Sequence, residues 1–141
     1  MRLKIILLLP PLMLGLFVSS LVKRLVPFSR IERLLGHPIN TRAYYSLLPT
    51  GSSKDWARAI KRSLPYAVRY TPLTVNCLDK VLAIACLFRM VGIPYSAYVG
   101  CGRVNGVFSA HAWLHSGSLC VVGGWSFDTF EILGGYVQRR L

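Results

Sequence analysis

A cysteine at the start of a predicted helix is the clearest chemical feature of the sequence. Asn76 is a good helix N-cap with Asp79 three residues later, and residues 77–91 follow a helical pattern that Gly92 ends. Cys77 would occupy the first helical position, where unpaired amides and the helix dipole favour a negative charge. Such a position lowers the pKa of a thiol, and the thiolate is the nucleophilic form. The sequence therefore predicts a nucleophile at Cys77.

A thiolate nucleophile needs a general acid nearby, and a histidine is the natural candidate. His111 lies in the middle of a predicted strand, residues 107–115, and is followed by Ala-Trp. A hydrogen-bonded place in the core would explain this histidine equally well, so its position alone does not assign it to catalysis. His115 lies on the same strand face beside a Ser-Gly turn, and His37 lies in polar loop sequence, so we expect both on the surface.

The other three cysteines are expected to be small core residues. Cys86 follows Cys77 by nine residues on the same predicted helix, about half a turn away and on the opposite face. Cys101 and Cys120 have the same interpretation. The sequence contains no C-x-x-C pair or close Cys/His set, so no zinc site is expected. It also has no phosphate-binding glycine motif.

The composition describes an apolar and basic chain. Of its 141 residues 53% are hydrophobic and 16% charged, with a formal net charge of +12. The length suits one domain, and this much apolar surface excludes intrinsic disorder. A single long apolar run excludes a many-helix transporter. The basic residues form no block, and the aromatics fall mostly in apolar runs, so nucleic-acid binding is not expected.

The apolar run, residues 5–22, has basic residues on both sides. Its length is near the ~20 residues that cross a bilayer, but Pro10 and Pro11 interrupt it. Since proline is tolerated in the first helical turn, the better helix begins near Pro11 and ends at about Leu25, too short to span comfortably. A helix packed on the domain or lying at an interface, a membrane anchor and a cleaved signal all stay open.

Two more helices are predicted before Cys77. Ser29 and Glu32 form a capping box, and Gly36 would end that short helix. Residues 37–51 are expected to be a loop. The next helix begins at residue 52 or 53, and Pro65 ends or kinks it. Its apolar stripe consists of Trp56, Ile60 and Leu64.

After the helix at 77–91 the pattern changes to short strands and turns. The expected elements are a strand at 95–101, a turn at 102–106, a strand at 107–115, a turn at 116–118 and a strand at 119–123. Residues 124–136 are expected to be mostly loop or a short edge element. Helices followed by an antiparallel meander predict the α+β class.

Two segments resemble transglutaminase-like cysteine peptidases, and most closely the leader peptidases of lasso-peptide biosynthesis, the B proteins. They are NCLDKVLAIACLFRMVGIPYSAYVG (76–100) and AHAWLHSGSLCVVGG (110–124). The shared pattern is Cys-Leu opening a helix, Gly-Ile-Pro after it, a strand that ends in Gly, and His-Ala-Trp. The stretch LVKRLVPFSRIERLLG (21–36) is similar to the helical start of that family. The resemblance implies a transglutaminase/papain-like core with Cys77 and His111 as catalytic residues.

The resemblance also implies a function and partners. Such enzymes cleave a ribosomally made precursor peptide after its leader, and a separate ATP-using, asparagine-synthetase-like cyclase then closes the ring. Longer members carry a leader-recognition domain, so for this chain a separate recognition protein is expected. No cofactor is expected at an evident motif, and ATP dependence would belong to the maturation complex. We expect a cytoplasmic protein, membrane-associated through residues 5–22 if at all, with a helical segment (1–42) and a peptidase domain (43–141).

The third catalytic group is where the sequence departs from the family pattern. Such enzymes place an acid on the strand after the histidine, where it orients the imidazole. A tight turn would pair His111 with positions 122–124, which are Val-Gly-Gly. Asp128 is the best candidate, and Glu131 or a backbone carbonyl is the alternative. A backbone amide at Cys77 is expected to serve the oxyanion hole.

Two other classes of function stay open. The missing acid opposite His111 is also typical of a non-catalytic transglutaminase-like module that binds peptides. A small membrane-anchored basic protein would explain residues 5–22 and the net charge of +12, and its resemblance to the peptidases would then be a coincidence.

Overall fold

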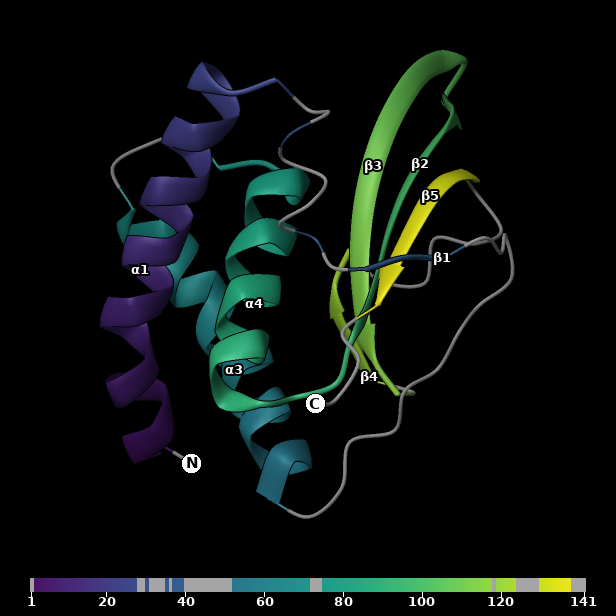
Figure 1. Ribbon diagram of the computed structural model, residues 1–141. Coiled ribbons are helices and arrows are strands. Elements are labelled where there is room, and N and C mark those ends of the chain that lie inside the picture. Colours follow the sequence, from purple (N-terminus) through teal and green to yellow (C-terminus); the bar gives the residue numbers. More distant parts are fainter. Residues whose placement is uncertain are drawn as a thin grey trace.

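In the computed structural model of the protein, the described helices precede the strands, apart from one short strand that follows the first helix (Figure 1). The structure describes residues 2–27, 30, 35, 37–39, 52–71, 75–117, 119–123 and 130–137. The helices there are α1 (Arg2–Leu25), α3 (Ser52–Tyr70) and α4 (Cys77–Val91). The strands are β1 (His37–Ile39), β2 (Ser96–Val104), β3 (Val107–Ser116), β4 (Leu119–Val122) and β5 (Glu131–Val137). This order confirms the α+β class.

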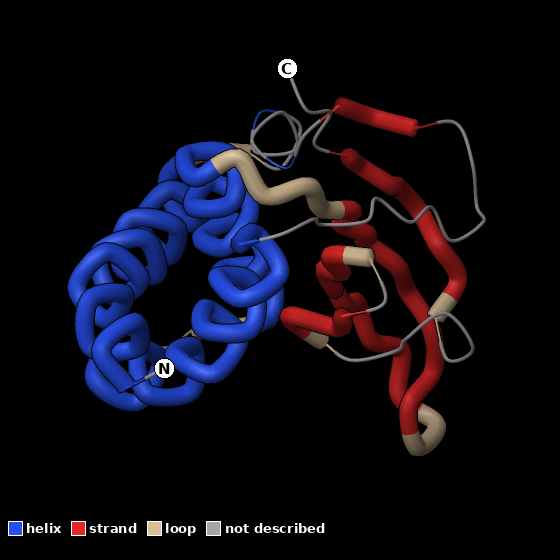
Figure 2. Tube along the Cα trace, turned by 90° about the horizontal axis from the view of Figure 1, so that it is seen from below, coloured by secondary structure: helices blue, strands red, loops and turns tan. Residues whose placement is uncertain are grey.

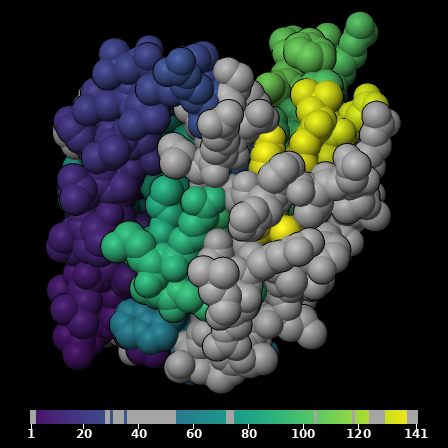
Figure 3. Space-filling view, viewed as in Figure 1, coloured from purple at the N-terminus to yellow at the C-terminus, as the bar shows by residue number. Residues whose placement is uncertain are grey.

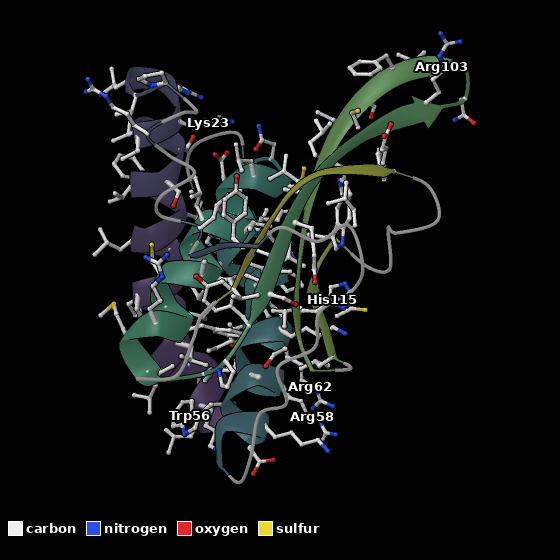
Figure 4. The ribbon with its side chains drawn as sticks, turned by 45° about the vertical axis from the view of Figure 1, so that its right-hand side comes forward. Lys23, Trp56, Arg58, Arg62, Arg103 and His115 are labelled. Atoms are coloured by element: carbon white, nitrogen blue, oxygen red, sulfur yellow. The ribbon has the colours of Figure 1, made fainter. Side chains whose placement is uncertain are left out.

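The strands form one antiparallel sheet in the order β1-β5-β2-β3-β4, and the helices lie together on one side of it (Figures 1 and 2). α4 packs against β3, α3 against β4, and α1 against both α3 and α4. The β2–β3 hairpin rises above the rest of the sheet, with Arg103 near its tip (Figure 4). The result is a layer of helices on a sheet.

One apolar core fills the space between helices and sheet. Its fully buried members include Leu12, Leu16, Ile60, Ile84, Phe88 and Leu114. Each such side chain stabilises the fold by ~1.5–3 kcal/mol relative to an exposed one. Strand alternation places Tyr98 and Trp113 on the other face of the sheet, where they are also buried and their ring centroids lie 5.9 Å apart.

α1 is longer than the sequence predicts. It begins at Arg2 instead of near Pro11 and continues through both prolines. A proline at position i removes the hydrogen bond to the carbonyl at i−4, which here belongs to Ile6 for Pro10 and to Leu7 for Pro11. Both of these residues are exposed, so solvent can hydrate their carbonyls. The expectation of a short helix is wrong for that reason.

α3 begins at Ser52, as predicted, but Pro65 does not end it. Pro65 is exposed, and so is Lys61, whose carbonyl loses its helical partner. Ile60 and Leu64 are buried, as the apolar stripe predicts. The helix therefore continues because its inner face stays packed while the defect faces water.

Both ends of α4 are capped as predicted. The Asn76 side chain accepts a hydrogen bond from the backbone N of Asp79, and the Asp79 carboxylate accepts one from the backbone N of Asn76. Gly92 ends the helix with φ 75°, a left-handed conformation that favours glycine. The start of α4, and with it the place of Cys77, is set by local sequence.

The strands differ from the prediction at both ends of the sheet region. β2 continues to Val104 instead of ending at Cys101, and the turn narrows to Asn105 and Gly106. His37–Ile39 form β1, where a loop is expected, because they pair with β5. The predicted helix between Ser29 and Gly36 falls mostly outside the described residues, as does the side chain of His37.

β5 is the largest departure from the prediction. Residues 124–136 are expected to be mostly loop or an edge element, yet Glu131–Val137 lie inside the sheet, between β1 and β2. Gly134 and Gly135 weaken the strand signal of this segment. Its pairing partners are remote in sequence, so only tertiary structure reveals it.

Candidate active site

Cys77 is half-buried at the first position of α4. The capping box fixes the backbone on either side of it, and the backbone N of Lys80 donates to the carbonyl of Asn76 at 3.2 Å. The thiol therefore lies at a helix N-terminus whose geometry is set by Asn76 and Asp79.

Asp79 is fully buried, and its carboxylate links α4 to α1. Its Oδ2 atom accepts from the backbone N of Asn76 at 3.1 Å and from Nζ of Lys23 at 3.3 Å. Lys23 lies near the C-terminal end of α1. Asp79 thus has both a local role as a cap and a tertiary partner, which the sequence analysis did not identify.

His111 lies on β3 and is half-buried. Its Nε2 atom lies 3.2 Å from the carbonyl O of Gly123, and its ring stacks on Phe130 and Trp113 with centroid distances of 4.9 and 5.9 Å. Only a protonated Nε2 can donate to a carbonyl, so in the neutral ring this contact leaves Nδ1 as the basic nitrogen.

One cleft of about 270 Å³ brings the two predicted catalytic residues together. Helix α4 contributes Cys77 and Leu78 with their cap, and strand β3 contributes His111 with the alanines on either side of it. The lining residues are Asn76, Cys77, Leu78, Val99, Ala110, His111 and Ala112. The cleft is mostly apolar and has a thiol and an imidazole at its border.

The thiol and the imidazole are not engaged with each other. Among the described residues no hydrogen bond joins Cys77 to His111. Strand alternation places the His111 ring on the face of Trp113, whereas Ala112 lies in the core on the face of α4. An ion pair between thiolate and imidazolium would require the ring to turn away from Phe130.

Of the candidates for the third catalytic group, the structure places Glu131 and the backbone carbonyl of Gly123. Asp128 lies outside the described residues. Glu131 is exposed at the start of β5 and pairs with Cys101 of β2, so β2 separates it from β3. The carbonyl of Gly123 is a backbone group in contact with His111, which is the kind of partner left as an alternative to Asp128.

A second thiol–imidazole contact lies on the neighbouring strands. The Sγ atom of Cys120 lies 3.4 Å from Nδ1 of His115. His115 is fully buried, so its predicted place on the surface is wrong. It pairs with Ser96 of β2 on one side and with Cys120 of β4 on the other, so it lies in the interior of the sheet. The tight turn after Ser116 is the sequence signal that could have revealed this pair.

The remaining thiols, among them Cys86 and Cys101, do not line the cleft that contains Cys77. Burial raises the pKa of Cys86, and the positive charge of Arg89 offsets part of that effect. Cys86, Cys101 and Cys120 are half-buried, which agrees only partly with their predicted place in the core. Within the described part of the chain, no group of three or more His, Cys, Asp or Glu side chains is placed to hold a metal ion.

A separate cleft of about 420 Å³ carries much of the exposed positive charge of α3. It is lined by Arg58, Lys61, Arg62 and Leu119, and Arg58 and Arg62 project from the same side of α3 (Figure 4). The N-terminus of α4 lies at the opposite end of the helical layer (Figure 1). This basic cleft is therefore distinct from the one that contains Cys77.

Comparison with known proteins identifies the class that this fold and site define. The profile of the family described as Transglutaminase-like superfamily matches residues 22–133. The chain therefore belongs to the transglutaminase-like superfamily, whose fold is of the cysteine peptidase type. The match extends from α1 into β5 and covers both Cys77 and His111. No curated protein and no solved structure matches the chain.

Proposed function

We propose that the protein is a cysteine peptidase that removes the leader from a ribosomally made lasso-peptide precursor. The observation that carries the proposal is that Cys77, at the capped start of α4, borders one cleft with His111 in a transglutaminase-like chain. The resemblance of residues 76–100 and 110–124 to lasso leader peptidases supports the choice of substrate.

In the proposed mechanism His111 takes the thiol proton, and the Cys77 thiolate attacks the carbonyl carbon of the scissile peptide bond. The tetrahedral oxyanion is stabilised by backbone N–H groups, with the amide at Cys77 as one donor. The C–N bond then breaks as the imidazolium protonates the leaving amine, which is the new N-terminus of the core peptide. Water, activated by the neutral imidazole, hydrolyses the thioester to release the leader and the free thiol.

Two groups are assigned to hold the His111 ring. Asp128 is proposed to orient the imidazole when the ring turns toward Cys77. In the conformation described here the carbonyl of Gly123 contacts Nε2 at 3.2 Å. Either partner would keep a proton on Nε2 and leave Nδ1 to exchange a proton with the thiol.

The proposed partners are the precursor peptide, a separate leader-recognition protein and an asparagine-synthetase-like cyclase. We assign the basic cleft of Arg58, Lys61 and Arg62 to an acidic surface of the recognition protein, because opposite charges steer such encounters. ATP would be used by the cyclase. The proposed location is the cytoplasm, where the precursor is made.

The test is to mix the full chain with the precursor and the recognition protein and to follow loss of the leader by mass spectrometry. Cys77→Ala and His111→Ala should each abolish cleavage, while Cys101→Ala, the matched control at another half-buried cysteine, should retain it. Cleavage by Cys77→Ala at the wild-type rate would contradict the mechanism.

A second candidate function is a non-catalytic peptide-binding module. The observation that favours it is that the His111 ring contacts Phe130 and Gly123 instead of the Cys77 thiol. The rate of Cys77 alkylation by iodoacetamide as a function of pH separates the two. A peptidase gives a reactive thiolate at neutral pH that His111→Ala suppresses, and a binding module gives an ordinary thiol that this change does not affect.

A further inference from the structure

α1 has two faces of opposite kind. One face packs on α3 and α4 and includes Leu8, Leu12, Leu16, Ser19 and Ser20. The other face is open along the whole helix, and Figure 3 shows it forming one side of the molecule. Between positions 3 and 22 its exposed residues are Leu3, Ile6, Leu7, Pro10, Pro11, Leu14, Phe17, Val18 and Leu21.

The polarity of α1 is the reverse of that of a helix on a water-facing surface. Its two serines are turned to the domain, while every exposed position between 3 and 22 is apolar. A helix of a water-soluble protein normally places polar residues outside. By length and composition Leu3–Leu25 is long and apolar enough to cross a membrane. Only 22% of its apolar stretch is buried inside the protein. The outer face of α1 is therefore suited to an apolar environment.

Three contacts hold α1 on the domain along its length. Near its start, Nζ of Lys4 lies 4.9 Å from the ring centre of Trp56, and near its end Lys23 contacts Asp79 at 3.3 Å (Figure 4). In the middle, a Cβ atom added at Gly15 would lie 3.4 Å from Cβ of Ala83. A helix docked in this way cannot cross a bilayer, because α3 and its charged residues would have to enter the hydrocarbon with it.

We propose that the outer face of α1 lies in the plane of an anionic lipid bilayer while the helix stays docked on α3 and α4. The depth of α1 in the bilayer follows from Pro10 and Pro11. These prolines leave the carbonyls of Ile6 and Leu7 without helical donors on the outer face. Such carbonyls are costly in hydrocarbon but are hydrated at the level of the lipid headgroups. This placement does not depend on the proposed peptidase function.

The charge of the protein favours lipid over a second copy of the chain as the occupant of this face. The formal net charge is +12, and Arg24 is exposed at the C-terminal end of the apolar outer face of α1. Two copies with this charge repel each other, whereas anionic headgroups attract each copy.

Co-sedimentation with vesicles tests the proposal on the full chain. We expect binding to vesicles of phosphatidylcholine and phosphatidylglycerol, weaker binding to phosphatidylcholine alone, and about tenfold weaker binding for Phe17→Gln. Phe108→Gln is the matched control, because it makes the same change at an exposed phenylalanine of β3. Circular dichroism checks that each variant is folded. Wild-type protein that does not bind vesicles, or that instead forms a dimer that Phe17→Gln dissociates, would overturn the proposal.

A disulfide lock separates in-plane binding from spanning. The 3.4 Å distance at Gly15 and Ala83 is close to the Cβ separation of a disulfide, so Gly15→Cys with Ala83→Cys should cross-link α1 to α4 on oxidation. Peptide mapping by mass spectrometry identifies the linked pair. The oxidised protein should bind vesicles as tightly as the same protein after reduction. Loss of binding on oxidation would mean that α1 must leave the domain, which contradicts the in-plane arrangement.

Discussion

The ammonium group of Lys23 lies 3.3 Å from the buried carboxylate of Asp79, and this contact joins the N-terminal helix to the start of the helix that carries Cys77. The same carboxylate oxygen accepts the backbone N–H of Asn76. Any displacement of α1 therefore removes the charged partner from a residue that also caps α4. The position of α1 and the geometry at Cys77 are linked through a single side chain.

Lys23→Gln is expected to destabilise the protein by about 1–3 kcal/mol, because it leaves the fully buried Asp79 carboxylate without its cation. The Lys23 side chain is 26% exposed, and partial solvent screening keeps the effect below that of a fully buried pair. Urea unfolding measures the change. Lys61→Gln, at an exposed lysine of α3, should stay within about 0.5 kcal/mol of wild type.

The double variant Lys23→Gln with Asp79→Asn completes a thermodynamic cycle. If the ion pair is the cause, the two changes together should cost less than the sum of the single changes. Strict additivity would show that Lys23 acts through packing and not through its charge.

Gly123→Ala is expected to cost more stability than Gly106→Ala. Both glycines have left-handed φ values, +80° and +79°, so each alanine carries the same backbone penalty of about 1–2 kcal/mol. An added Cβ at Gly123 would also lie 2.7 Å from Cβ of Trp113, whereas Gly106 has open space. The difference between the two variants in the free energy of unfolding, measured with urea, gives the steric cost of the added Cβ at Gly123. Equal losses would mean that β4 can shift away from Trp113 at no cost.

Stability at high pH should depend on Tyr95. Burial raises the pKa of Tyr95, while the adjacent Arg89 guanidinium offsets part of the rise. The pKa of Tyr95 is higher in the folded protein than its unfolded value of about 10. The stabilisation that protonated Tyr95 contributes is therefore fully present below pH ~10 and is lost as the pH rises through the folded pKa.

Tyr95→Phe tests this dependence. The change removes a hydrogen bond to the carbonyl of Leu35 at 2.6 Å and one from Nε of Arg89 at 3.1 Å, so it should cost about 1–3 kcal/mol at neutral pH. Its unfolding free energy should fall less steeply above pH ~10 than that of wild type. Tyr70→Phe, at an exposed tyrosine, should leave both the value and the slope unchanged.

Cys86 should be alkylated slowly in the folded protein. Burial raises its pKa, so less thiolate is present at neutral pH than in an unfolded chain. Peptide mapping after timed iodoacetamide treatment should show a lag at Cys86 that disappears in urea. A rate that is the same with and without urea would contradict this prediction.

The parts of the fold that were predicted correctly depend on neighbouring residues. Asn76 with Asp79 at one end of α4, and Gly92 at the other, are capping signals that no tertiary contact overrides. The place of Cys77 at the start of a helix follows from them directly.

The parts that were missed depend on contacts between remote residues. The helices continue through Pro10 and Pro65 because the opposite faces of α1 and α3 are packed, and a sequence pattern does not show packing. His115 lies in the interior of the sheet because strands pair on both sides of it. The orientation of the His111 ring depends on its contacts with Gly123 and Phe130. Both residues are remote from His111 along the chain, since Gly123 follows the next turn and Phe130 comes after it.

The order of strands in the sheet has a consequence for how the chain folds as it is synthesised. β1 lies at the edge of the sheet and pairs with β5, so that Pro38 is opposite Tyr136. Contacts between such distant residues form slowly, because a long loop must close first. Residues 37–39 leave the ribosome without their partner, which is the last of the described strands to be made. The interior of the sheet is therefore completed only after residue 137 has been synthesised, and a ribosome-bound chain already displays Cys77 while the sheet beside it is still open.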